Sequence, residues 1–148
     1  MLSFYFYLYH PSTIWSLPEL YGSVKYAKIF FAIAAFMMAL AICLGAFGAH
    51  ALKSILDESM LKIYNTGSQY HFYNTLGLFA GTLIYALKPN SKKIFISLWL
   101  MLLGMIIFSF SLYFLAILSL PILGAITPIG GTLLILAWLT LTYGILKD

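Results

Sequence analysis

Residues 94–146 read IFISLWLMLLGMIIFSFSLYFLAILSLPILGAITPIGGTLLILAWLTLTYGIL, which is 53 consecutive positions without Asp, Glu, Lys or Arg. A single helix of that length would measure about 80 Å, whereas the hydrocarbon core of a bilayer is about 30 Å thick. The segment must therefore fold back on itself inside the membrane. We expect two antiparallel helices, over about residues 94–118 and 129–146. The helix breakers that place the bend between them are Pro121, Gly124, Pro128, Gly130 and Gly131.

Two more runs, residues 29–52 and 63–87, also lack Asp, Glu, Lys and Arg. Each is long enough for one membrane-spanning helix, and we expect these helices over about residues 29–49 and 70–87. The prediction is an all-α integral membrane protein. It is an antiparallel four-helix bundle forming one transmembrane domain over residues 29–146, with both termini on the same side.

The composition excludes a water-soluble fold. Of 148 residues, 63% are hydrophobic and 8% are charged, and the mean hydropathy is +0.99, whereas a soluble domain carries roughly 25% charged residues. The lysines are scattered between apolar runs, so nucleic acid is excluded as a partner. The partner implied is the lipid bilayer, with other membrane proteins or a second copy left open. Cys43, the single cysteine, is expected to be a small buried apolar side chain.

Lysine placement predicts the orientation. One side of the expected bundle carries six lysines and the other carries two, Lys53 and Lys62, beside Asp57 and Glu58. The positive-inside rule then puts both termini in the cytoplasm of a bacterial inner (plasma) membrane, or in the matrix for a mitochondrial inner membrane. The six lysines of the richer side are Lys25, Lys28, Lys88, Lys92, Lys93 and Lys147.

The connecting segments differ in character. Ser91 is expected to cap the third helix. Residues 51–63 have apolar positions near helical spacing, which predicts a short surface helix, and residues 65–67 would then turn the chain into the bilayer. Residues 1–28 do not fit a cleavable signal and are predicted to form an interfacial aromatic arm or to reflect a mis-assigned start, so deleting residues 1–23 should leave membrane insertion intact.

Small residues recur at helical spacing, and helices in lipid associate by close backbone approach at such residues. The expected packing positions are Ala41, Gly45 and Ala49 in the first helix, Gly77 and Gly81 in the second, and Gly130 and Gly131 in the fourth. Polar side chains within the membrane can add interhelical hydrogen bonds. These are Ser109, Ser111, Tyr113 and Thr127.

Four stretches together resemble one family: residues 44–53 (LGAFGAHALK), 70–76 (YHFYNTL), 108–113 (FSFSLY) and 124–131 (GAITPIGG). The resemblance is to the uncharacterised small four-helix membrane family known as domain of unknown function 423, typified by bacterial YgdD and animal transmembrane protein 256. It covers about residues 25–146 and implies an inner-membrane protein with four spans and no established activity.

The sequence departs from that family's pattern at four positions. His71 stands where the family has glutamine and Asn74 where it has histidine, while Phe110 replaces a glycine and Ala125 a proline. A mechanism that requires the family histidine one turn inside the second helix therefore cannot operate in the same way in this chain, which has Asn74 at that position.

His50, His71, Asn74 and Tyr70 are the weak candidates for a cofactor site. His50 ends the expected first helix and His71 opens the second, so both are expected near the outer surface, where two imidazoles could hold haem, a quinone or a metal. A structural role is preferred, because His50 can pair with the last helix carbonyls. We expect no cofactor and no metal.

The uncharged hairpin over residues 118–131 is the least ordinary loop. Thr127 is expected to cap the fourth helix and Pro128 to be its first residue. This apolar loop, with His50 and Asn74, could shape a shallow groove facing lipid or a partner.

The leading interpretation of function is a non-enzymatic accessory, scaffold or assembly protein, because no catalytic motif is found. One alternative is a haem, quinone or metal binder using His50 and His71. A second is a passive pore lined by the four polar residues, or a transporter, although the expected spans lack an ionisable group near the bilayer centre.

Overall fold

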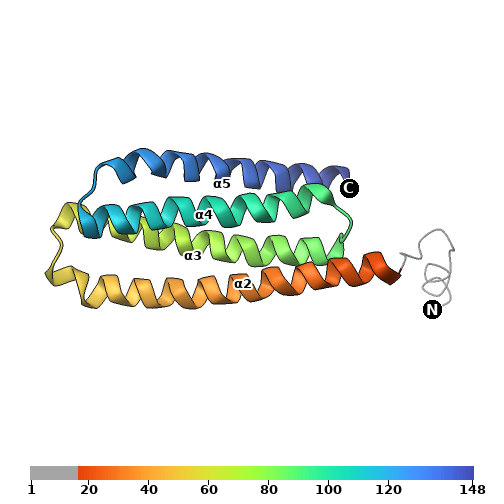
Figure 1. Cartoon of the computed structure of the whole chain (residues 1–148), viewed down its shortest axis with the longest axis horizontal. Coiled ribbons are helices and arrows are strands. Elements are labelled where there is room, and N and C mark those ends of the chain that lie inside the picture. The colour runs from red at the N-terminus through yellow and green to blue at the C-terminus, as the bar shows by residue number, and fades with distance from the viewer. Residues whose placement is uncertain (1–16) are drawn as a thin grey trace.

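The computed structural model describes residues 17–148, with side chains from Val24 onward. In this part of the chain four long helices run antiparallel, and the start of the first lies at the same end as the C-terminus (Figure 1). The all-α antiparallel bundle is thereby confirmed. Of the predicted arm, residues 1–16 lie outside the described residues. The elements are α2 (Leu17–His50), the 3-10 turn η2 (Leu52–Ser54), α3 (Glu58–Leu87), α4 (Lys92–Leu118) and α5 (Ile122–Lys147).

Three of these helices are long and apolar enough to cross a membrane, with spans at Val24–Ser54, Lys92–Leu118 and Ile122–Lys147. The fourth helix, α3, is less apolar because it carries many polar side chains, of which some, such as His71, Asn74 and Thr75, are buried inside the bundle. It runs alongside α4 in the same antiparallel array (Figure 1). Inward-facing polar groups lower the mean hydropathy of a helix without exposing them to lipid.

The core lies mainly around α4, which buries more of its apolar span than α2 or α5 does. Its inner face packs with all three other helices, through residues such as Phe30 of α2, Leu78 of α3 and Leu134 of α5. Because α2 is an outer helix, much of its surface is unburied, and Cys43 is exposed rather than buried as predicted. The remaining core positions on α4 are Ile94, Leu98, Met101, Leu102 and Met105.

Helix α2 starts at Leu17, about twelve residues before the predicted boundary at 29. The prediction used the absence of charge to find the helix end, but lysines are good helix formers and Pro18 is tolerated in a first turn. A helix can therefore extend beyond the hydrocarbon core. The charge-free run therefore does not mark where α2 begins.

Helix α3 also starts early, at Glu58, and the predicted surface helix over 51–63 and the turn at 65–67 are both wrong. Asp57 is the reason, because its carboxylate accepts a hydrogen bond from the Met60 backbone N–H, 3.0 Å away, and caps the helix. Only η2 and four further residues separate α2 from α3. Gly67 stays helical, since it is packed closely against Ser109 and Leu112 of α4.

The Asp57 cap should make the first turn of α3 sensitive to acid. The Ser59 hydroxyl donates to this carboxylate, and this bond, followed by the one from Met60, lowers the pKa of Asp57 below its ordinary 3.8. A carboxyl whose pKa falls on folding stabilises the structure above its unfolded pKa, and the contribution is lost as the pH falls through the folded value. We expect the protection of the residue 59–61 amides against hydrogen exchange, relative to their intrinsic rates, to fall below pH 3.8, and Asp57→Ala to lack this protection at every pH. Unchanged exchange in that variant would contradict the cap.

Helix α5 begins at Ile122, so the predicted hairpin over 118–131 shrinks to three residues after α4. Ser119 makes the sharp turn with a left-handed backbone, φ 51°. Pro128 lies inside the helix and Thr127 is not its cap, since the Thr127 hydroxyl donates to the Leu123 carbonyl. A proline is tolerated in a membrane helix when neighbouring helices and hydroxyl side chains satisfy the freed backbone groups. At the other turn the predicted cap is present, as Ser91 Oγ accepts from the Ile94 N–H at 3.1 Å.

Candidate functional site

A buried histidine lies inside the bundle between α3 and α4. His71 has no exposed surface, and its Nδ1 lies 3.3 Å from the hydroxyl of Tyr113 on α4. Its Nε2 is buried without a hydrogen-bond partner among the described residues. At 1.5 Å per residue, His71 is about 12 Å beyond Ile63, where the charge-free part of α3 begins. The bundle therefore holds an ionisable side chain in its interior, in the charge-free part of α3.

Aromatic side chains surround His71 toward the η2 end. The ring of Tyr64 lies 4.8 Å from that of Tyr113, and its hydroxyl donates to the Leu44 carbonyl of α2 at 2.8 Å. Gly48 of α2 makes room for Tyr64, because a Cβ there would lie 2.4 Å from the ring. Three helices thus meet at one polar cluster of His71, Tyr64 and Tyr113.

The four weak cofactor candidates do not form one site. Tyr64 contacts Gly48, so these two residues lie at the same level of the bundle. From that level His50 lies two residues toward the end of α2, and His71 lies two turns in the opposite direction. The two histidines are therefore separated by roughly 13 Å along the bundle. His50 is exposed. Asn74 donates to the carbonyl of Tyr70 at 2.8 Å and is occupied within its own helix. The prediction that both histidines lie near the surface is wrong for His71, because α3 starts at Glu58.

A metal site finds no support in this geometry. Among the side chains that the structure describes, residues 24–148, no group of three or more His, Cys, Asp or Glu is arranged to hold an ion. The single buried imidazole has one tyrosine as its polar neighbour, and protein metal sites need several ligands. The haem, quinone or metal alternative based on His50 and His71 therefore lacks its second ligand.

The small residues lie at close helix contacts. A Cβ at Gly77 would be 2.7 Å from the ring of Trp138 on α5, and one at Gly81 would be 2.9 Å from Leu98 on α4. Gly130 lies directly against the α4 backbone, since a Cβ there would be 2.4 Å from the backbone nitrogen of Phe108. Gly131 beside it is less crowded, at 3.6 Å from the Phe108 ring.

The packing positions predicted on α2 are shifted by one residue at its end. Ala41 is fully buried, and a Cβ at Gly45 would make ordinary contact with Ser68 and Phe72 of α3. Ala49 is exposed, and Gly48 instead faces Tyr64. The predicted spacing of four drifts off the contact, because a helix has 3.6 residues per turn.

The four polar intramembrane residues divide between two contacts. Ser111 and Thr127 hydroxyls lie 2.8 Å apart and join α4 to α5. Tyr113 faces His71 of α3 instead, and Ser109 is fully buried with no partner for its hydroxyl among the described residues. These side chains therefore lie in different helix contacts and do not form one shared surface within the chain.

The Ser111–Thr127 contact should contribute a measurable but small coupling. Interhelical hydrogen bonds in membranes average about 0.6 kcal/mol, so Ser111→Ala and Thr127→Val together should cost less than the sum of the two single variants by about that amount. Unfolding of the four proteins in a mixed detergent gives the coupling. Strict additivity would show that the two hydroxyls do not interact.

The outer face of α3 carries a polar stripe that our sequence analysis missed. Asn65, Gln69 and Tyr73 follow one another at helical spacing, all are exposed, and no hydrogen bond to either amide is found among the described residues. They line two shallow grooves along the helix. The sequence signal that could have predicted this stripe is the recurrence of polar residues at a spacing of four within the charge-free segment.

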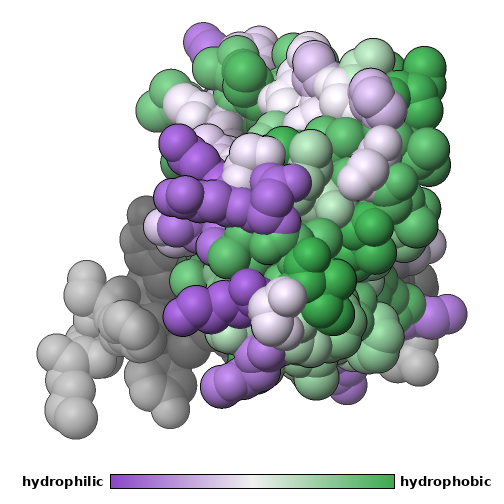
Figure 2. All heavy atoms as spheres, turned by 90° about the vertical axis from the view of Figure 1, so that its left-hand side faces the viewer, coloured by the Kyte–Doolittle hydropathy of each residue, from purple (hydrophilic) through white to green (hydrophobic). Residues whose placement is uncertain are grey.

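The two ends of the bundle differ. Figure 2 looks onto the η2 end, where hydrophilic side chains gather on one part of a largely hydrophobic face; Lys53, Asp57 and Glu58 are exposed there. At the other end the Asp148 carboxylate accepts hydrogen bonds from Lys93 and Ser91. The bond from Lys93 is the main cause that lowers the pKa of Asp148 below its ordinary value. Because Lys88 also donates to the Ile145 carbonyl, the α3–α4 turn is tied to the end of α5.

These features define the class of protein: an all-helical integral membrane protein whose helices meet at glycine contacts and one buried polar cluster. Residues 44–131 match the family described as protein of unknown function (DUF423), and the chain belongs to this family. The resemblance predicted from the four motifs is thereby confirmed.

Bacterial relatives cover most of the chain. The UPF0382 membrane protein YwdK of Bacillus subtilis is 38% identical over 120 residues, which is 81% of this chain and 98% of that protein. A UPF0382 membrane protein of Staphylococcus epidermidis is 40% identical, covering 81% and 97%. One of Haemophilus influenzae is 40% identical, covering 72% and 85%. No solved structure matches the chain.

Proposed function

We propose that the protein is a non-enzymatic scaffold of the bacterial plasma membrane, which binds a transmembrane helix of another membrane protein along the outer face of α3. The observation that carries this proposal is the pair of exposed amides, Asn65 and Gln69, with Tyr73 one turn further on. Gln69 lies about 9 Å beyond Ile63, inside the charge-free segment.

An amide facing lipid is unfavourable, because hydrocarbon offers it no hydrogen-bond partner and burying an unpaired polar group costs about 1–3 kcal/mol or more. Several other polar side chains of α3, among them His71 and Thr75, avoid this cost by facing the bundle interior. A partner helix with polar side chains at matching depth would satisfy the outward amides, and such contacts bind membrane helices together.

Site-specific crosslinking tests the proposal. A photo-crosslinking amino acid at Tyr73 should join the protein to one discrete partner, and Gln69→Leu should reduce that adduct about threefold or more through loss of the hydrogen bond. The matched control is the same amino acid at Leu139 of α5, since Leu139 and Tyr73 are both 62% exposed. It should give lipid adducts alone.

The result distinguishes the alternatives. An adduct with twice the chain mass would identify a homo-oligomer in place of a scaffold for another protein. Lipid adducts at both positions, or an adduct unaffected by Gln69→Leu, would refute the binding face.

We also propose that the lysine-rich end faces the cytoplasm, as the six-to-two distribution of lysines supports. Cys43 is the only cysteine, so Cys43→Ser gives a background in which single probes can be added. An impermeant maleimide on intact cells should label Ser54→Cys and leave Asn90→Cys unlabelled. The reverse pattern would invert the orientation.

A further inference from the structure

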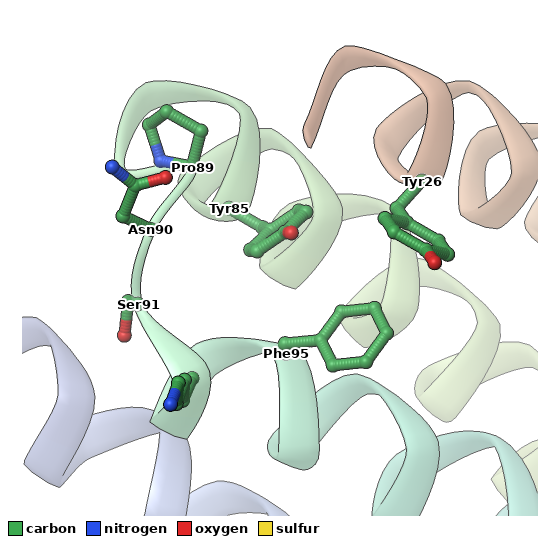
Figure 3. A pocket seen from close by; sticks show the side chains of 7 residues that line it. Tyr26, Tyr85, Pro89, Asn90, Ser91 and Phe95 are labelled. Atoms are coloured by element: carbon green, nitrogen blue, oxygen red, sulfur yellow. The ribbon is translucent and has the colours of Figure 1, made fainter. Parts of the chain in front are cut away.

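A pocket of about 190 Å³ opens at the lysine-rich end, between α2, α3 and the turn into α4. Figure 3 shows the rings of Tyr26 of α2, Tyr85 of α3 and Phe95 of α4 gathered on one side of it, opposite the turn. The turn closes one side. The remaining lining residues are Pro89, Asn90, Ser91 and Lys92.

The pocket holds polar groups that the fold leaves available. Tyr85 is only 5% exposed and its ring points into the pocket, yet its hydroxyl has no hydrogen-bond partner among the described residues (Figure 3). Of the three lysines around the turn, Lys93 binds Asp148 and Lys88 donates to the Ile145 carbonyl. Lys92, exposed at the pocket rim, makes neither kind of bond within residues 24–148, whose side chains the structure describes.

Below the pocket an aromatic seam follows the contact between α2 and α4 into the bilayer. The ring of Phe95 lies 5.2 Å from that of Tyr26 and 5.9 Å from that of Phe30. Phe30 in turn lies 5.2 Å from Trp99, which is 44% exposed. The seam thus presents partly exposed rings directly beneath a polar pocket with a lysine at its rim.

From this arrangement we propose that the pocket binds the headgroup phosphate of an anionic phospholipid, whose acyl chain lies along the aromatic seam. Lys92 supplies the charge, and the Tyr85 hydroxyl and Asn90 amide supply donors to the phosphate oxygens. Basic pockets between membrane helices are typical sites for anionic headgroups. The aromatic seam favours a phospholipid over free phosphate as the ligand, because the acyl chain of a bound lipid would contact the exposed rings and a free ion would not.

Native mass spectrometry of the full chain in detergent tests the site. With phosphatidylglycerol we expect one lipid to stay bound after activation, and with phosphatidylcholine none. Tyr85→Phe with Lys92→Gln should weaken the dissociation constant about tenfold, since hydrogen bonds to a charged group are lost. Lys53→Gln, an exposed lysine at the opposite end, is the matched control and should bind as the unchanged protein does.

A second measurement separates the two sources of phosphate. Glycerol phosphate added in large excess should fail to displace the lipid, because it lacks the acyl chain that contacts the seam. Complete displacement would identify a site for free phosphate and overturn the lipid assignment. Equal retention of both lipids, or an unchanged affinity in the double variant, would overturn the site itself. Circular dichroism of the double variant confirms that it is folded.

Discussion

Replacing Gly130 with alanine is expected to destabilise the bundle by about 1–3 kcal/mol, more than any other single methyl addition on α5. The new Cβ would lie 2.4 Å from the nitrogen and 2.8 Å from the Cα of Phe108. Both atoms belong to the backbone of α4, so no rotamer change can relieve the clash. The two helices would have to move apart. Thermal unfolding of the purified protein in detergent measures the loss.

Gly131→Ala is the matched control for this variant. It adds the same methyl group one position away, where the nearest atoms are those of the Phe108 ring at 3.6 Å, an ordinary contact. Both variants gain the same helix propensity, about 1 kcal/mol. Their difference therefore reports packing alone, and equal unfolding midpoints would show that α4 and α5 are not in close backbone contact at Gly130.

The sequence marks both glycines as packing residues but does not distinguish them. The choice depends on the rotation of α5 about its axis, which is set by contacts such as Gly104 on Leu134 and Gly130. The prediction that Pro128 begins the helix followed from the preference of proline for the first helical position. It failed because a proline inside a membrane helix is stabilised by tertiary packing.

The position of His71 shows the same limit. The charge-free runs predicted four long helices, and residues 17–148 form four. They did not predict where α3 begins, because Asp57 caps it well outside the apolar run. Once α3 starts at Glu58, His71 is carried into the bundle and away from His50. The separation of the two histidines thus follows from one capping residue.

The polar stripe and the pocket differ in how far sequence could have predicted them. Asn65, Gln69 and Tyr73 share a face by helical spacing alone, and that face could have been recognised without a structure. The pocket brings together Tyr26, Tyr85 and Phe95 from three helices. Which helices are neighbours is decided by packing across the whole bundle, which no local pattern records.

Gly48→Ala is the other substitution for which we expect a large effect, about 1–3 kcal/mol from overpacking. Its Cβ would lie 2.4 Å from the ring of Tyr64. This ring cannot easily move, because its hydroxyl binds the Leu44 carbonyl at 2.8 Å and its face lies against Tyr113. The variant must therefore separate α2 from α3 at the η2 end or break that hydrogen bond. Gly45→Ala, where the nearest atom is Ser68 Oγ at 3.4 Å, should be close to neutral.

A double variant shows whether the Tyr64 ring is the cause. Tyr64→Leu alone should destabilise the protein, because it removes a fully buried ring and its hydrogen bond to α2. In the Gly48→Ala background the same change should cost less, since the shorter side chain relieves the clash and the two effects are coupled. If the two costs simply add, the ring does not meet residue 48. The three-helix contact around His71 would then lack the support from α2 on which its geometry depends.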